Sequence, residues 1–148
     1  MHDKESKMRL FKMISGINII FKRWAEKKLK KFGMTFSQFG VMLILLQKEG
    51  LSQRELADAF NIDTTSIMVI CDSLEKKQWI KRQSDPNDRR INRLFFTEEG
   101  RHVFSNSLPT IKEGYEEVFN SITDEELELI SPLIEKIYNK VKILSETK

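Results

Sequence analysis

The stretch from residue 51 to residue 97 constrains the fold more than any other part of this 148-residue chain. It predicts two short helices in close succession, after which the hydrophobic period changes from that of a helix to that of a strand. Two strand-like segments, residues 79–83 and 92–96, enclose a turn-rich segment that ends in two arginines. Few folds place a helix pair directly before a basic hairpin, so this order of elements narrows the fold before any other feature.

Local signals indicate where these two helices begin and end. Ser52 and Glu55 form an S-x-x-E capping box, so the first helix should start at Gln53. Asn61 should end it, because asparagine tolerates positive φ better than most residues, and Asp63 should cap the second helix. The second helix carries one apolar stripe at helical spacing, formed by Ile67, Ile70, Cys71 and Leu74. Helices separated by so few residues must cross and pack on a shared core.

A helix pair followed by a basic hairpin is the layout of a winged helix-turn-helix, which reads duplex DNA. The second helix should enter the major groove with the face opposite its apolar stripe. The residues on that face are Thr65, Met68, Val69, Asp72, Ser73 and Lys76. Thr64, Thr65 and Ser66 lie near the helix start, where hydroxyl and amide groups suit phosphates and base edges; the alternative is a purely capping role.

Helical periodicity continues on the N-terminal side of this segment. Residues 7–31 predict one long amphipathic helix, which Gly33 ends. Thr35 and Gln38 form a second capping box, which opens a helix that runs to Gly50.

Two more helices are expected on the C-terminal side. Residues 103–122 predict a long helix that Pro109 should kink, because proline removes one backbone donor. Thr123 and Glu126 form a third capping box, and the apolar residues from 127 to 144 then follow a heptad-like spacing. This seam is shorter than the length at which a heptad pattern alone proves a coiled coil.

The chain is therefore expected to be a mainly α protein, one intertwined domain with a two-stranded β wing. Residues 34–100 form the DNA-binding region, and residues 1–33 with 101–148 form a helical dimerisation region. The terminal helices are too apolar on one face to stand alone. They could cover one another, but a second copy of the chain is the better partner, because two readers can bind two half-sites on duplex DNA.

Charge is distributed unevenly, although the net charge is only +3. Residues 1–33 hold 10 Lys and Arg against 3 Asp and Glu, and residues 76–93 hold 7 against 2. The second concentration falls on the hairpin, which fits a duplex-DNA reader better than a general polyanion binder. The basic run at residues 27–31 is better explained as a solvated helix face. We expect Lys76, Lys81, Arg82 and Arg93 to contact phosphates rather than bases.

Composition argues against several other classes of protein. No apolar run approaches the roughly 20 residues that a membrane span needs, and the first residues lack the apolar core of a signal peptide. The single cysteine, Cys71, suits a reducing compartment, so we expect a cytoplasmic protein with a buried structural thiol. The two histidines, His2 and His102, are far apart in sequence, so no metal site and no cofactor are expected.

Several motifs make the chain similar to the MarR family of transcriptional regulators over nearly its whole length. The matching segments are residues 34–39, 51–57, 72–77, 85–90 and 94–100. The wing segment Asp85-Pro86-Asn87-Asp88-Arg89-Arg90 followed by a T-E-x-G helix start is the specific part. The resemblance implies a helical homodimer with two winged readers on duplex DNA. It also implies a ligand-responsive repressor, less often an activator, with a pocket between dimer helices and reader.

The recognition helix departs from the family pattern. The family commonly has Thr-Arg at the positions of Met68 and Val69, and Arg at the position of Ser73. The chain therefore lacks the arginines that read guanine by two hydrogen bonds. Either Met68 and Val69 contact thymine methyl groups in an A·T-rich inverted repeat, or DNA affinity is weak and the chain has another role. The intact wing favours the first interpretation.

The resemblance also suggests roles for the wing tip. One of Arg89 and Arg90 would reach into the minor groove while Asp88 orients the pair, because a narrow A·T minor groove attracts arginine; the alternative is two solvated turn residues. Five apolar residues could line a pocket for a small apolar or aromatic effector: Phe11, Trp24, Phe36, Phe39 and Met42. Their spacing equally describes ordinary core, which we favour.

These observations predict a duplex-DNA-binding transcriptional regulator, a homodimeric repressor relieved by a small-molecule effector. An enzyme is disfavoured, because the sequence has no phosphate-binding glycine loop, metal-ligand spacing or nucleophile–base set. The alternative is a helical dimeric interaction protein of the same fold whose sequence-specific DNA binding is weak or lost.

Overall fold

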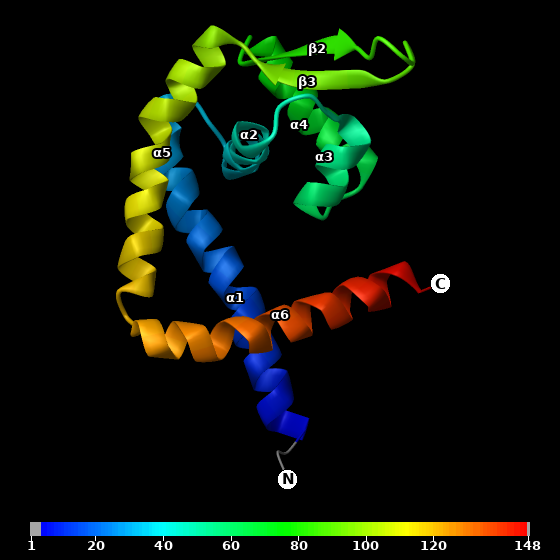
Figure 1. Cartoon of the computed structure of the whole chain (residues 1–148). Coiled ribbons are helices and arrows are strands. Elements are labelled where there is room, and N and C mark those ends of the chain that lie inside the picture. The colour runs from blue at the N-terminus through cyan, green and yellow to red at the C-terminus, as the bar shows by residue number, and fades with distance from the viewer. Residues whose placement is uncertain (1–3, 148) are drawn as a thin grey trace. The chain divides into compact units, whose positions relative to one another are not determined.

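The computed structural model describes residues 4–147, and the chain divides into two compact units, residues 1–111 and 112–148. The first unit contains α1 (Lys4–Leu29), a short 3-10 helix η1 (Lys30–Phe32), α2 (Phe36–Gln47), β1 (Leu51–Ser52), α3 (Gln53–Phe60), α4 (Thr64–Lys76), β2 (Ile80–Ser84), β3 (Asn92–Phe96) and most of α5 (Glu98–Phe119) (Figure 1). The second unit contains the end of α5 and all of α6 (Asp124–Glu146).

The helix boundaries follow the local signals in the sequence. Three predicted capping boxes, at Thr35, Ser52 and Thr123, are present with both of their hydrogen bonds. Asp63 caps α4 by accepting a hydrogen bond from the backbone nitrogen of Ser66. These four caps satisfy backbone groups that would otherwise lack a partner. Asn61 and Gly33 adopt the left-handed conformation predicted for them, at φ 56° and 65°.

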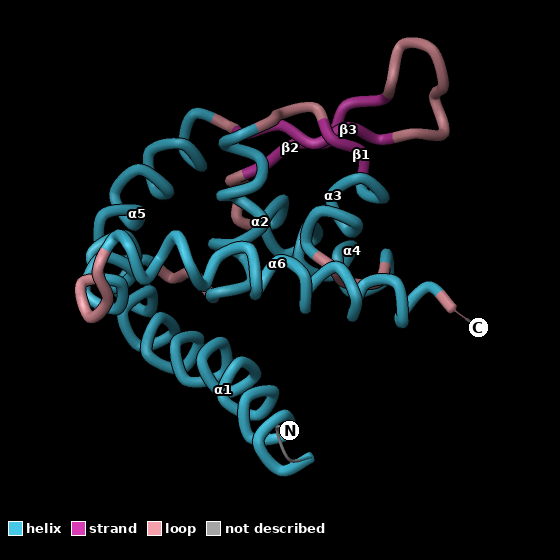
Figure 2. The backbone as a smooth tube through the Cα atoms, turned by 60° about the horizontal axis from the view of Figure 1, so that its bottom comes forward, coloured by secondary structure: helices cyan, strands magenta, loops and turns pink. Residues whose placement is uncertain are grey.

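The sheet has three antiparallel strands in the order β1-β3-β2, not the two that the sequence predicted (Figure 2). In the hairpin, Ile80 pairs with Phe96 and Arg82 with Leu94. The additional strand is β1, whose Leu51 pairs with the other edge of β3. A strand of two residues leaves no alternating pattern in the sequence, so periodicity could not reveal it. The hairpin projects beyond α3 and α4 in both views (Figures 1 and 2).

The core of the first unit lies where α2, α3 and α4 pack under the sheet. It is formed by fully buried side chains from each element, including Met42, Leu45, Leu56, Ile67, Leu74, Ile80 and Leu94. Phe39 of α2 packs against Phe104 of α5 with ring centroids 5.1 Å apart. Pro109 lies inside α5, which continues to Phe119. The C-terminal end of α1 joins this core through Ala25 and Leu29, whereas most of α1 is exposed.

The second unit leaves a series of apolar side chains exposed. On α6 these include Leu127, Ile130, Leu133, Ile134, Val141 and Leu144.

Of the described helices, none alone is long and apolar enough to cross a membrane. The segments Lys4–Phe32 and Phe36–Gln47 meet that criterion only together, bent by 82° at their junction.

Candidate nucleic-acid interface

The exposed face of α4 carries the residues that the helical period placed there. Met68 is 43% exposed and Val69 is 63% exposed, while Ile67, Cys71 and Leu74 on the opposite face are buried. Single exposed apolar side chains are ordinary on protein surfaces, but here two adjacent ones occupy the outer face of α4. This face can therefore offer methyl and methylene groups to a partner. Beyond them, near the C-terminal end of the helix, Lys76 is exposed.

The N-terminal turn of α4 combines exposed hydroxyl groups with a tight cap. Thr64 and Thr65 are exposed. Asp63 accepts two hydrogen bonds from Ser66, one from its backbone nitrogen at 2.8 Å and one from its hydroxyl at 2.7 Å. These bonds, the hydroxyl first, lower the pKa of Asp63, so the cap is charged near neutral pH. Ser66 therefore takes part in the cap, and its exposed hydroxyl lies with those of Thr64 and Thr65 at the helix start.

The side chain of Ser73 was predicted to point outward from α4, and the structure places it otherwise. It is half-buried at the margin of the exposed face. Its hydroxyl donates to the carbonyl oxygen of Ile70 at 2.7 Å and accepts from the side-chain amide of Gln38 at 2.9 Å. The hydroxyl of Ser73 thus has partners inside the protein.

The wing is held in shape by its two aspartates. Asp85 is buried and accepts hydrogen bonds from the backbone nitrogens of Asn87 at 2.7 Å and Asp88 at 3.3 Å, and from the guanidinium of Arg93. Asp88 accepts from the Nε and Nη2 atoms of Arg90, each at 3.0 Å. The Arg90 side chain remains 90% exposed. Asp88 therefore orients Arg90 without covering it.

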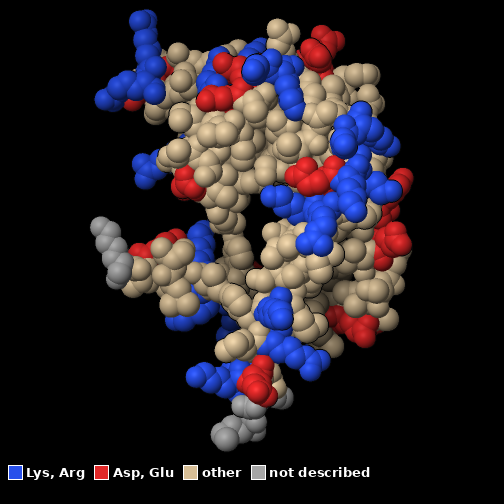
Figure 3. All heavy atoms as spheres, turned by 180° about the vertical axis from the view of Figure 1, so that it is seen from behind, with Lys and Arg blue, Asp and Glu red and all other residues tan. Residues whose placement is uncertain are grey.

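Electrostatics at the wing follow from these contacts. The hydrogen bond from Arg93 holds the pKa of Asp85 below its usual value, and the hydrogen bond from Arg90 does the same for Asp88. Arg89 is exposed beside them. Figure 3 shows Lys and Arg side chains projecting at the free end of the hairpin, at its upper left. Cationic groups at the tip of a projecting hairpin suit the phosphate backbone and the minor groove of DNA.

Arg82 has a structural role that the sequence interpretation missed. Its guanidinium donates to Asp72, to Glu75 at 2.9 Å and to Gln53 at 2.8 Å, which joins β2 to α4 and α3. A signal was available, because strand alternation places Arg82 on the same face as buried Ile80.

Arg93 also has partners within the protein. It contacts Glu55 at 3.4 Å and donates to the carbonyl oxygen of Gly50 at 2.8 Å, in addition to its bond with Asp85. Both Arg82 and Arg93 were predicted to contact phosphates, and both donate hydrogen bonds to partners within the protein.

Comparison with known proteins identifies the family. The profile of the MarR family matches residues 32–91. The uncharacterised HTH-type transcriptional regulator YpoP of Bacillus subtilis (strain 168) is 30% identical over 142 residues, which cover 95% of this chain and 94% of YpoP. The chain belongs to the MarR family. It is a transcriptional regulator of the winged-helix type, as the sequence motifs predicted.

Two solved structures share the fold. A mutant MarR from E. coli in complex with operator DNA is 21% identical, with a TM-score of 0.80, and the match covers 92% of this chain and 99% of that one. CouR of Rhodococcus jostii RHA1 bound to p-coumaroyl-CoA is 24% identical, with a TM-score of 0.76, and the match covers 84% of this chain and 88% of that one. At these identities the likeness establishes the fold alone.

The five residues predicted as an effector pocket differ in burial and do not form one cluster in this MarR-family chain. Phe39 and Met42 are buried in the core. Trp24 and Phe36 are half-buried at the junction of α1 and α2, whereas Phe11 is 54% exposed farther along α1. Phe21, which was not in the predicted set, lies with its ring centroid 5.2 Å from that of Trp24 and 6.1 Å from that of Phe36. Phe39 and Met42 thus belong to the core, whereas Phe21, Trp24 and Phe36 form a half-buried aromatic group at its edge.

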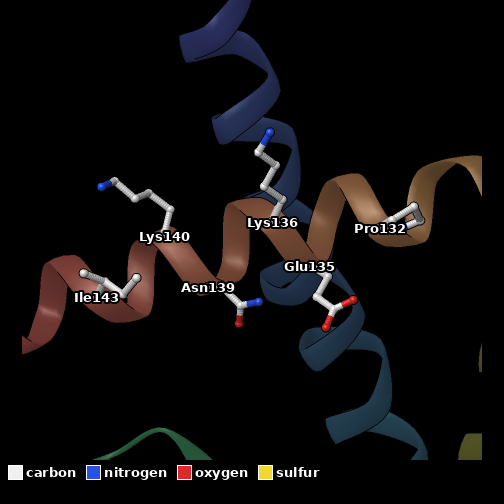
Figure 4. A pocket seen from close by; sticks show the side chains of 6 residues that line it. All are labelled: Pro132, Glu135, Lys136, Asn139, Lys140 and Ile143. Atoms are coloured by element: carbon white, nitrogen blue, oxygen red, sulfur yellow. The ribbon is translucent and has the colours of Figure 1, made fainter.

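A concave surface is formed by residues of α6 alone. It is lined by Pro132, Glu135, Lys136, Asn139, Lys140 and Ile143 (Figure 4). Figure 4 shows that all six side chains come from one helix, so this surface is an open groove and not an enclosed ligand pocket.

Cys71 is buried in the core, and burial raises the pKa of its thiol to about 11. A thiol of this kind is a poor nucleophile at neutral pH, which agrees with the structural role predicted for it. Within residues 4–147 no three His, Cys, Asp or Glu side chains are grouped so that they could hold a metal ion. His2 lies outside the described residues.

Proposed function

We propose that this MarR-family regulator is a cytoplasmic, homodimeric repressor that binds an A·T-rich inverted repeat in duplex DNA and is released by a small apolar or aromatic effector. The observation that carries the proposal is the pairing of an exposed apolar face on α4, at Met68 and Val69, with a cationic wing tip at Arg89 and Arg90. Methyl groups in the major groove mark thymine, and a narrow minor groove attracts arginine, so both elements favour A·T-rich DNA.

The role of each wing residue follows from the hydrogen bonds of Asp88. We propose that Arg90 enters the minor groove, because Asp88 fixes its orientation while the side chain stays exposed. Arg89, Lys76 and Thr65 are proposed to contact the phosphate backbone. The operator complex of the mutant E. coli MarR, which has the same fold, supports DNA as the partner.

Dimerisation is supported by apolar side chains that nothing in their own unit covers. They lie on α1, where Leu10, Phe11 and Ile17 are exposed, and on α6, where Leu133 and Val141 are exposed. A second copy of the chain would remove both faces from water and supply two readers for an inverted repeat. Light scattering should then give twice the chain mass of 17.5 kDa; a protein of single mass would contradict this part of the proposal.

An effector is supported by the half-buried aromatic group of Phe21, Trp24 and Phe36. Aromatic rings at the edge of a core offer stacking surfaces to a planar ligand. CouR, which shares the fold, is bound to p-coumaroyl-CoA.

The proposal is tested by selecting duplexes from a random library with the purified protein and measuring their affinity at several salt concentrations. We expect enrichment of an A·T-rich inverted repeat, whose binding weakens steeply with salt as phosphate contacts require. Salt-dependent binding with no sequence preference would leave only a general DNA binder. Absence of binding at low salt, with effector-free protein, would favour the alternative, an interaction protein of the same fold. The absence of arginine at positions 69 and 73 is the observation that keeps this alternative in view.

A further inference from the structure

Gln38, in the first turn of α2, is one of three buried polar residues in the described part of the chain, and it is 5% exposed. Its Oε1 atom accepts hydrogen bonds from the backbone nitrogen of Thr35 and from Nζ of Lys77, each at 3.0 Å. Its Nε2 atom donates to the hydroxyl of Ser73 at 2.9 Å. Because the oxygen faces two donors and the nitrogen faces an acceptor, these neighbours determine the orientation of the amide.

The partners of this amide are themselves held in place. The Ser73 hydroxyl donates to the carbonyl oxygen of Ile70, so its lone pairs are available to Gln38. The ammonium group of Lys77, at the C-cap of α4, also donates to the carbonyl oxygen of Gly33. Gly33 is the left-handed residue that ends η1. These hydrogen bonds together join the end of α4 to the start of α2 and the turn before it.

This network is mechanically linked to the exposed face of α4. Gln38 lies beneath the surface, so it cannot itself contact a base or a phosphate. Met68 and Val69 precede Ser73 by about one turn of the same helix. A helix is stiff over that length, so a change of tilt at Ser73 and Lys77 must also move the exposed face.

We infer that Gln38 is a positioning residue for DNA recognition, which sets the tilt of α4 by joining Ser73 and Lys77 to the turn that precedes α2. The inference rests on the proposed function. It also gives a physical role to serine at position 73, because its small hydroxyl side chain bonds to both Ile70 and Gln38.

The test compares Gln38→Leu with Gln38→Glu in the full-length protein. Leucine removes all three side-chain bonds. Glutamate keeps the acceptor for Thr35 and Lys77, and the Ser73 hydroxyl can rotate to donate to it. The probes are the duplex selected with the wild-type protein and a scrambled duplex of the same composition. We expect Gln38→Leu to weaken binding to the selected duplex about tenfold and to the scrambled duplex less than about twofold, with Gln38→Glu within about threefold of wild type on both.

Ser107→Ala is the matched control, because Ser107 is also buried but its hydroxyl bonds to Phe104, at 2.9 Å, and to Met34 rather than to α4. It should lower the melting temperature without changing the ratio of the two affinities. The salt dependence of Gln38→Leu should equal that of wild type, since no phosphate contact is removed. Adding Ser73→Ala to Gln38→Leu should cause little further loss, because both changes break one shared bond.

Wild-type selectivity in folded Gln38→Leu protein would overturn the inference, as would losses that multiply in the double variant. If Gln38→Leu does not fold, the Ser73→Ala/Lys77→Met variant replaces it. We expect the same loss of about tenfold in affinity for the selected duplex and less than about twofold for the scrambled duplex, and wild-type selectivity in this variant would overturn the inference. A wild-type protein that selects no duplex overturns the proposed function and this inference together. Selective binding by wild type with unchanged variants overturns the inference alone.

Discussion

Gly100, near the start of α5, lies against the carbonyl oxygen of Trp79, and a β-carbon on Gly100 would be 1.9 Å from that oxygen. The same carbonyl accepts a hydrogen bond from the backbone nitrogen of Thr97 at 3.1 Å. The Thr97 hydroxyl in turn accepts from the Gly100 nitrogen at 2.9 Å and donates to the carbonyl oxygen of Gln78 at 2.6 Å. The T-E-x-G motif thus joins the start of α5 to the backbone that leads into β2.

Replacing Gly100 by alanine should therefore destabilise the protein. The methyl group would meet backbone, which cannot rotate away as a side chain can, so we expect a loss of about 3 kcal/mol in the free energy of unfolding. Urea unfolding measures it. Gly16→Ala in α1 is the control, because nothing lies within 4 Å of its added β-carbon and alanine favours a helix. Equal stability of the two variants would contradict the packing argument.

Arg82 should contribute to stability rather than to phosphate binding. Its side chain is 18% exposed and contacts two carboxylates on α4. Both carboxylates face solvent, which screens the ion pairs, so Arg82→Gln should cost about 1–2 kcal/mol. Lys81→Gln removes the same charge from the next, exposed position and should stay within about 0.5 kcal/mol of wild type in the same urea experiment. A Lys81 variant as unstable as the Arg82 variant would show that net charge alone matters.

The helix caps and the Arg82 ion pairs show which contacts could be predicted from local sequence and which could not. Caps at Ser52, Asp63 and Thr123 were predictable, because each depends on residues within one helical turn. The Arg82 ion pairs, by contrast, depend on how β2 lies over α4. The side chain of Ser73 lies at the margin of the exposed face of α4, and its orientation depends on the hydrogen bond from Gln38. These contacts cross 10 and 35 residues of sequence, a distance over which periodicity carries no information.

The wing should lose order in acid. Asp85 has a pKa held below its ordinary value of 3.8, first by the hydrogen bond from Arg93 and then by the amide of Asn87. Because the pKa of Asp85 is lower in the folded state than in the unfolded state, its charged carboxylate stabilises the wing at every pH above the unfolded pKa. That stabilisation is lost as the pH falls through the folded pKa, here below about pH 4.

Amide NMR signals of Asn87 and Asp88 should therefore shift together in this range. In the Asp85→Asn variant the side-chain oxygen remains but the charge is absent, so these signals should no longer follow that titration. Signals that titrate identically in the variant would assign the transition to another group.

The thymine contacts proposed for Met68 and Val69 can be tested from the DNA side. Replacing thymine by uracil in the selected duplex removes only the methyl group in the major groove. Each contacted methyl should cost about 1 kcal/mol of binding free energy, in line with its apolar area. The Met68→Ala/Val69→Ala variant should bind both duplexes equally. If uracil lowers the affinity of this variant as much as that of wild type, other residues read the methyl groups.

Asp88 offers a test in which two explanations predict opposite signs. Replacing it by asparagine removes a negative charge beside the phosphate backbone, which by charge alone should strengthen DNA binding. If Asp88 orients Arg90 through its two hydrogen bonds, the same change weakens that fork and should weaken binding to the selected duplex several-fold. Fluorescence anisotropy with labelled duplex measures the affinity. Arg90→Ala should cost more than Arg89→Ala, and adding Asp88→Asn to Arg90→Ala should restore the effect of charge alone. Tighter binding by Asp88→Asn in the presence of Arg90 would show that Asp88 does not orient it.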